Sequence, residues 1–224
     1  MHNSRILRLI SAAGILVMIV FSIIASKWLL AEAYHYQARA FMDSWNPNQD
    51  IPKGEWEIVH DALTKSIKLN STQATYYEDM SELMFLKTFE SSLNPLEHAF
   101  LQKQALEHIR QAVNLRPSWP YAWAQFALIK YRLYELDKEV SLALEKAIVL
   151  GPWESSVQMI VAEVSFSCWK NLDHALTEKI LKQFERTSQS EIAKVFDIAK
   201  KYNMTAPLCQ KLINKPTPAK LCPK

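Results

Sequence analysis

Glycine is scarce in this sequence: only Gly14, Gly54 and Gly151 occur among 224 residues. Phosphate-binding and dinucleotide-binding loops need several glycines close together, because only glycine lets the backbone approach a phosphate so tightly. The sequence therefore excludes these nucleotide-binding motifs. The six histidines are scattered, and no two have the His-Glu-x-x-His spacing of a zinc protease. We expect no metal site and no cofactor.

Acidic residues are absent from the first 31 positions, which contain Arg5, Arg8 and Lys27. These three residues account for the whole net charge of +3, so the rest of the chain is balanced. Nucleic-acid-binding domains carry a basic stripe that supplies much of their affinity. The charge distribution therefore predicts no nucleic-acid partner.

An uncharged apolar run covers residues 9–26, and the stretch 9–31 reaches the length that a helix needs to cross a bilayer. Because two arginines precede the run, the positive-inside rule predicts that residues 1–8 are cytoplasmic. We expect a single-pass protein of the bacterial inner membrane whose main domain is periplasmic. Two other interpretations are a signal peptide cleaved near Ala31-Glu32-Ala33 and a buried core helix.

Only three cysteines are present. Cys209 and Cys222 flank a proline-containing segment near the end of the chain, and outside the cytoplasm they would be either a disulfide or two free thiols. Cys168 shares a helical stripe with Val157 and Val161, which predicts a buried structural thiol rather than a nucleophile.

From residue 32 onward, apolar residues recur at helical spacing and no segment alternates as a strand does. We expect an all-α domain over residues 32–204 and an irregular tail over 205–224, which contains lysines and prolines. The tail is either simply solvated or attracted to an anionic polysaccharide or to lipid headgroups. The apolar helix is expected to continue to about residue 41, followed by helices around 56–67, 77–84, 101–112, 119–133, 138–150, 153–169, 173–186 and 190–203.

Two prolines, Pro117 and Pro120, mark a helix boundary in the centre of the domain, in the stretch LRPSWPYAWAQFALIKYRL. Pro117 moves Arg116 out of the helical region and ends one helix. Ser118 is expected to cap the next helix, and Pro120 falls in its first turn, where the backbone N–H has no partner anyway. The two prolines therefore predict the turn of an antiparallel helix pair.

A similar helix-boundary pattern occurs three times in the sequence. Aligning the segments that begin at Lys68, Val113 and Val149 matches four sets of residues: Ser71, Pro117 and Pro152; Tyr77, Trp123 and Gln158; Met80, Phe126 and Val161; Ser81, Ala127 and Ala162. The interval from Pro117 to Pro152 is close to the ~34-residue period of a tetratricopeptide repeat (TPR), and the longer interval before it leaves room for an inserted loop.

The chain resembles TPR proteins over about residues 55–170. The residues that match the motif are Ala105, Ile109, Ala112 and Pro117 in the second helix of one unit, and Trp123, Phe126 and Ala127 in the first helix of the next. Lys130 departs from the aromatic residue expected there. The resemblance implies a stack of antiparallel helix pairs, following the N-terminal transmembrane helix, whose first helices line a concave groove. By this register the expected partner-binding groove residues are Glu78, Glu82, Tyr121, Gln125, Tyr131, Arg132 and Glu163, a mixture that suits a peptide segment or a sugar chain.

A narrower resemblance is carried by the block RPSWPYAWAQFALIKYRLYELDKEVSLALEKAIVLGPWE, which runs from Arg116 to Glu154. Together with the apolar N-terminal run, this block resembles the single-span, helical-repeat proteins of bacterial exopolysaccharide gene clusters known as VpsP-like. The resemblance implies a role in polysaccharide biosynthesis or export with protein partners in a polysaccharide-assembly machine. It implies no catalytic residue.

The leading hypothesis is a membrane-anchored, non-enzymatic adaptor that works by protein–protein interaction, with polysaccharide as a second candidate contact. One alternative is a glycan-cleaving enzyme, which would need a pair of carboxylates such as Glu78 and Glu82, or Glu163. A second alternative is a membrane-tethered periplasmic folding factor.

Overall fold

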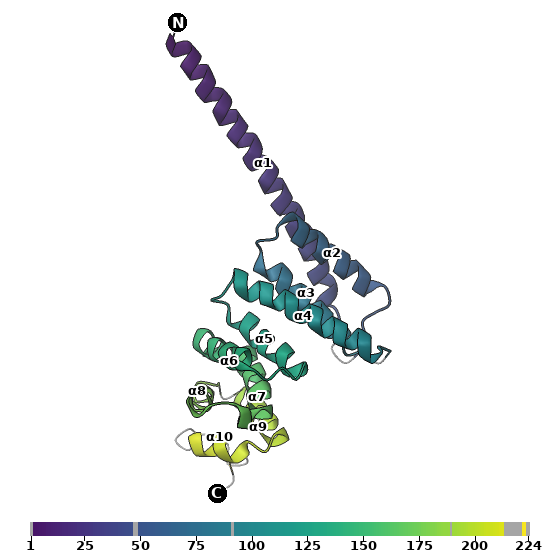
Figure 1. Ribbon diagram of the computed structural model, residues 1–224, viewed down its shortest axis with the longest axis vertical. Coiled ribbons are helices and arrows are strands. Elements are labelled where there is room, and N and C mark those ends of the chain that lie inside the picture. The colour runs from purple at the N-terminus through teal and green to yellow at the C-terminus, as the bar shows by residue number, and fades with distance from the viewer. Residues whose placement is uncertain (1, 47–48, 91, 189, 213–220, 223–224) are drawn as a thin grey trace.

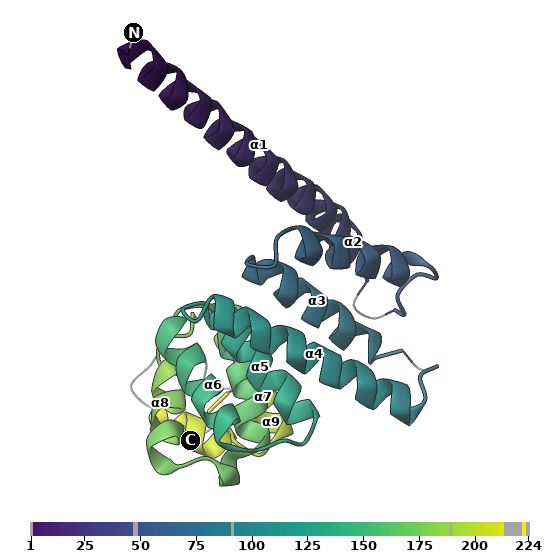
Figure 2. The same ribbon diagram turned by 45° about the horizontal axis from the view of Figure 1, so that its top comes forward.

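The computed structural model describes residues 2–46, 49–90, 92–188, 190–212 and 221–222, and the regular elements in these ranges are all helical. Successive helices pair and the pairs stack in sequence order, away from a long N-terminal rod (Figures 1 and 2). The all-α stack expected from the sequence is therefore confirmed. The helices are α1 (His2–Met42), α2 (Glu55–Leu69), α3 (Ala74–Lys87), α4 (Pro95–Leu115), α5 (Pro120–Arg132), α6 (Lys138–Leu150), α7 (Ser155–Ser167), the 3₁₀ turn η1 (Trp169–Asn171), α8 (His174–Phe184), α9 (Ile192–Lys201) and α10 (Thr205–Lys211).

Helix α1 is at once the apolar N-terminal segment and the first helix of the first pair. Its outer part packs against α2 and α3, with Ala31 and Ala38 fully buried, and Ser66 of α2 donates a hydrogen bond to the Ala31 carbonyl (2.9 Å). The side chains of residues 11–30 are all exposed, and α1 is the one helix in the described residues long and apolar enough to cross a membrane. A membrane anchor and a signal sequence share this pattern. No break separates the apolar part of α1 from the stack.

The three motifs aligned in the sequence adopt the same local structure. In each, a side chain on the first helix donates to a backbone carbonyl six residues earlier, and so ties the turn to the helix that follows. The three bonds are Tyr77 Oη to Ser71 O (3.3 Å), Trp123 Nε1 to Pro117 O (2.8 Å) and Gln158 Nε2 to Pro152 O (2.9 Å). The small residues of the alignment, Ser81, Ala127 and Ala162, are all fully buried where helices pack closely.

The start of α5 differs from the prediction in one residue. Trp119, not Ser118, occupies the N-cap position, and Pro120 is the first helical residue. Trp119 makes no capping hydrogen bond. Its indole Nε1 donates instead to Glu78 on α3 (3.0 Å). A contact between helices has therefore replaced the local capping bond.

Lys130, which departs from the TPR motif, is almost fully buried (1% exposed) at the turn between α5 and α6. Its ammonium group lies 2.6 Å from Asp137, the N-cap of α6, and 2.5 Å from Glu139. Arg110 of α4 also binds Glu139 (2.6 Å). Hydrogen bonds from Arg110 and Lys130 lower the pKa of Glu139 to about 2. The methylene stem of Lys130 thus packs where the TPR motif has an aromatic ring, and its ammonium group stabilises the turn between α5 and α6.

The prediction of an irregular tail over residues 205–224 is wrong for its first part, because α10 begins at Thr205. Pro207 lies in the first turn of α10, where backbone N–H groups have no helical partner, so it does not break the helix. Cys209 of α10 forms a disulfide with Cys222. Cys168 is a buried free thiol, as expected, and burial raises its pKa to about 11.

The lysines near the C-terminus are paired with acids wherever the structure describes them. Lys200 binds Asp197 (3.2 Å), and Lys201 and Lys211 reach back to acids on α7 and α8. The remaining tail lysines, at positions 215, 220 and 224, lie outside the described residues. The described part of the basic segment therefore contributes to the packing of the last helices.

Candidate functional site

The predicted groove residues lie on the first helices of three successive pairs, α3, α5 and α7. Four of them line one cleft of about 190 Å³ between α3 and α5, which we call the α3–α5 cleft. The polar residues of this cleft are Glu78, Asp79, Glu82, Tyr121 and Gln125, and its apolar walls are Ile109, Ala122 and Ile160. The other three predicted residues, Tyr131, Arg132 and Glu163, lie outside this cleft.

Glu78 is a half-buried acid in the cleft. Its Oε2 accepts the hydrogen bond from Trp119, whereas its Oε1 is buried and has no hydrogen-bond partner among the described residues. The guanidinium group of Arg116 stacks on the Trp119 ring, 3.8 Å from its centroid, and forms no ion pair with Glu78. Burial raises the pKa of Glu78, against the opposing effect of the Trp119 hydrogen bond.

Glu82 belongs to an ionic network between α3 and α1. Arg39 of α1 binds Glu82 (2.9 Å) and approaches the buried Asp79 (3.4 Å), while His35 of α1 binds Asp79 (2.6 Å). Burial raises the pKa of Glu82, although Arg39 partly compensates. For His35, the carboxylates of Asp79 and Glu32 outweigh burial and raise its pKa.

Sequence reasoning missed this network. His35 is one of the six scattered histidines, to which the sequence assigns no role, and it is half-buried where α1 meets α3. The available signal was the spacing of Ala31 and Ala38, which indicates a buried stripe on α1 with His35 and Arg39 beside it. That signal identifies the helix face but not the acid that would meet it.

Tyr121 closes the cleft on the side of α7. Its hydroxyl donates a short hydrogen bond to Glu154, the residue that precedes α7. This bond raises the pKa of Tyr121. Gln125, one turn further along α5, presents an amide that can donate and accept. The cleft therefore offers two hydrogen-bonding groups on α5 opposite the carboxylates of α3.

The remaining predicted residues form a second group with α9. Glu163 accepts hydrogen bonds from Lys201 (2.7 Å) and from the Tyr202 hydroxyl (2.6 Å). Burial opposes ionisation of Glu163, but these two bonds outweigh it and lower its pKa. Tyr131 is half-buried beneath the guanidinium group of Arg132, which lies 5.9 Å from the ring centroid. The groove residues expected as one surface are thus two groups in the structure.

The carboxylates considered for glycan cleavage are engaged in structural contacts. Glu78 binds Trp119, Glu82 binds Arg39 and Glu163 binds Lys201 and Tyr202. Most glycosidases use two carboxyl groups that flank the scissile bond, one as a general acid and the other as a base or nucleophile. In the described part of the chain, no group of three His, Cys, Asp or Glu side chains is placed to hold a metal ion.

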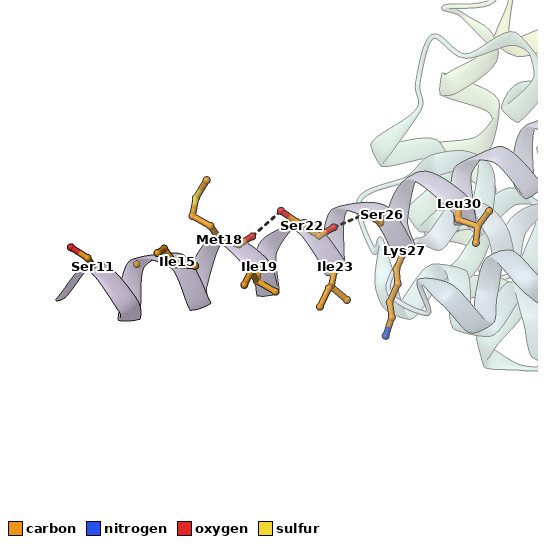
Figure 3. A pocket seen from close by; sticks show the side chains of 10 residues that line it. Ser11, Ile15, Met18, Ile19, Ser22, Ile23, Ser26, Lys27 and Leu30 are labelled. Atoms are coloured by element: carbon orange, nitrogen blue, oxygen red, sulfur yellow. Dashed lines mark hydrogen bonds between the residues drawn. The ribbon is translucent and has the colours of Figure 1, made fainter. Parts of the chain in front are cut away.

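Larger hollows of about 970, 440, 410 and 310 Å³ lie elsewhere on the described surface. The largest, about 970 Å³, runs along α1 and is lined only by α1 residues, so it has no opposite wall (Figure 3). Ser22 and Ser26 there donate to the carbonyls of Met18 and Ser22, which satisfies their hydroxyls within the helix. Another hollow, of about 410 Å³, is mostly apolar and lies beside Trp56 of α2 and the exposed Leu96 and Phe100 of α4.

No protein-family model matches the sequence, and no curated protein matches it. Among solved structures, the chain is similar to TTC0263, a thermophilic TPR protein in Thermus thermophilus, with a TM-score of 0.53 and 17% identity over 82% of this chain and 81% of that one. Two crystal structures of MamA give TM-scores of 0.47 and 0.46, at 15% and 16% identity, covering 77% of this chain and 80% and 75% of theirs. The chain therefore has a TPR-like stack of paired helices with a long apolar N-terminal helix.

Proposed function

We propose that this protein is a membrane-anchored scaffold that holds a partner protein against the first helices of its stack. The observation that carries the proposal is the continuity of α1 from the apolar segment into the first helix pair. A scaffold on a flexible linker would present its partner at any orientation. A stack that shares a helix with its anchor presents the partner at a fixed orientation to the membrane.

The second support is the nature of the surface. Stacked helix pairs offer an extended face whose residues come from several units, which suits recognition of a protein segment better than chemistry on a small molecule. The polar groups along α3, α5 and α7 are mixed in charge, and Tyr121 and Tyr131 add aromatic contact area. Interfaces are enriched in such aromatic and arginine side chains.

We further propose that the partner belongs to a machine of exopolysaccharide biosynthesis or export. This step depends on the resemblance of the block from Arg116 to Glu154 to the VpsP-like proteins. We also propose that α1 crosses the inner membrane and that the stack is periplasmic, because Arg5 and Arg8 precede the apolar run. The disulfide between Cys209 and Cys222 supports an oxidising compartment.

Site-specific cross-linking in cells tests the scaffold. A photoreactive amino acid replaces Gln125 in the cleft, and a matched control carries it at Leu142, which is 47% exposed on the second helix α6. We expect the cleft position to capture one or a few proteins and the α6 position to capture none of them. Equal capture at both positions contradicts the proposal. Capture of many unrelated unfolded proteins identifies a folding factor instead.

A second measurement tests the pathway. The captured proteins are identified by mass spectrometry in cells that produce the protein from its own gene. We expect sugar transferases, a polymerase or export components, and loss of the protein should reduce secreted polysaccharide. A partner without any link to polysaccharide would refute the pathway while leaving the scaffold intact.

A further inference from the structure

The α3–α5 cleft combines a carboxylate side with apolar walls at the scale of a single side chain. Its volume of about 190 Å³ is below the ~300–1,000 Å³ typical of small-molecule sites. The acids come from α3, and the walls come from Ile109 of α4 and Ile160 of α7. The cleft is therefore sized and lined for one elongated side chain with a polar end.

One carboxylate oxygen in this cleft lacks a partner. Trp119 satisfies Oε2 of Glu78, but Oε1 is buried and accepts no hydrogen bond from the residues that the structure describes. Buried polar atoms in folded proteins nearly always have a hydrogen-bond partner. Because Oε1 is shielded from solvent while the Glu78 side chain lines the cleft, a donor from outside the chain can reach this oxygen once the carboxylate turns toward the cleft.

The nearby cations are already engaged. Arg39 is shared among Asp43, Asp79 and Glu82, and Arg116 lies over the Trp119 ring, where its charge acts on Glu78 without forming an ion pair. Within the described residues, no ion pair reaches Glu78, although its neighbours on α3 are balanced by α1. The four carboxylates Asp43, Glu78, Asp79 and Glu82 outnumber the nearby His35, Arg39 and Arg116, so the local charge favours a further cationic group at Glu78.

We propose that the α3–α5 cleft receives one basic side chain of the partner protein, whose cationic end binds Glu78 and whose methylene stem lies against Ile109 and Ile160. Lysine and arginine have both parts, a charged head and an apolar stem. Charge-assisted hydrogen bonds to a carboxylate are the stronger kind, so this contact would anchor the partner segment. The inference rests on the proposed scaffold function and specifies the chemistry of its partner.

Two small probes test the cleft without knowledge of the partner. Butylguanidinium carries the charge and the stem, whereas butylurea has nearly the same shape without the charge. Because the Trp119 indole N–H donates to Glu78, its ¹⁵N–¹H signal reports directly on the site. In the full-length protein in detergent micelles, we expect a saturable shift of this signal with butylguanidinium and little change with butylurea.

Two variants then test whether the carboxylate of Glu78 binds the probe. Glu78→Gln should weaken butylguanidinium binding by at least about tenfold, the loss of a charge-assisted bond. Glu57→Gln, which removes the same charge from an exposed position on α2, should leave binding unchanged. Unchanged binding by Glu78→Gln overturns the inference. Should that variant fail to fold, equal shifts by the two probes in the wild-type protein overturn it just as well.

The result separates this inference from the scaffold proposal. A partner captured at Gln125 whose basic residues can all be replaced without loss of binding leaves the scaffold standing and overturns the basic anchor. Selective binding of butylguanidinium together with no captured partner supports the chemistry of the cleft and contradicts the scaffold.

Discussion

Replacing Gly151 with alanine tests how tightly the α5–α6 pair closes. Gly151 is the C-cap of α6 and is buried against Pro120, the first residue of α5. A Cβ atom at position 151 would lie 2.7 Å from Cβ and 2.9 Å from Cγ of Pro120. A proline ring cannot rotate away, so the backbone must move. The φ of −125° at Gly151 is open to other residues, and any cost therefore comes from the contact.

The magnitude follows from two opposing effects. Extra atoms in a close-packed site cost about 1–3 kcal/mol. The Gly→Ala change also restricts the unfolded chain, which stabilises the protein by about 0.4–1 kcal/mol. We expect Gly151→Ala to lower the free energy of unfolding by about 1–2 kcal/mol, and Tm by about 2–8 °C for a chain of this size.

Thermal unfolding of the full-length protein in detergent micelles, followed by circular dichroism, measures this change. The matched control is Gly14→Ala, because a Cβ there meets nothing within 4 Å. A double-mutant cycle with Pro120→Gly removes the two closest atoms and leaves only Glu154 Cγ at 3.3 Å, the end of a flexible stem, so Gly151→Ala should cost much less in that background. An unchanged cost with Pro120→Gly, or a Gly151→Ala variant as stable as wild type, refutes the reasoning.

Three further changes have defined outcomes. Lys130→Met removes the cation that binds Asp137 and Glu139 and should cost about 1.5–3 kcal/mol in denaturant unfolding; a neutral result contradicts the structural role of this lysine. The pKa of Glu139 is about 2 in the folded protein against an ordinary value of 4.5, so its contribution to stability is present above pH 4.5 and lost as the pH falls toward 2. Stability of Glu139→Gln should consequently fall less steeply than that of wild type over this range, and parallel curves would disprove the assignment. Cys209→Ser opens the disulfide to Cys222, which spans 13 positions, and should cost about 3 kcal/mol by the loop-entropy estimate; a wild-type midpoint that does not respond to reductant argues against the bond.

The helical stack could be predicted from the sequence because its signals are local. Pro117 and Pro152 each end a helix through backbone sterics that act within two residues. The spacing between these prolines gave the repeat, and the aligned side chains Trp123 and Gln158 make equivalent hydrogen bonds in the structure. The predicted tail failed for an equally local reason, because Pro207 falls in the first turn of α10, where proline is tolerated.

The sequence predicted the helices of the first pair but not that they pack as a pair. The apolar pattern continued from the N-terminal run to about residue 41, which predicts one long helix. That the outer part of this helix would act as the first member of a repeat pair depends on the burial of Ala31 and Ala38 by α2 and α3. Periodicity marks a face for burial but does not say which helix covers it.

The sequence by itself determined which helices form the candidate site, α3, α5 and α7. It also determined which face of these helices carries Glu78, Tyr121 and Glu163. Only the tertiary structure decided which of these groups are available. Trp119 takes one oxygen of Glu78 and leaves the other unpartnered, while Lys201 and Tyr202 occupy Glu163. Each pairing joins residues about 40 positions apart, and such contacts are set by how helices cross and pack, which no local pattern of residues encodes.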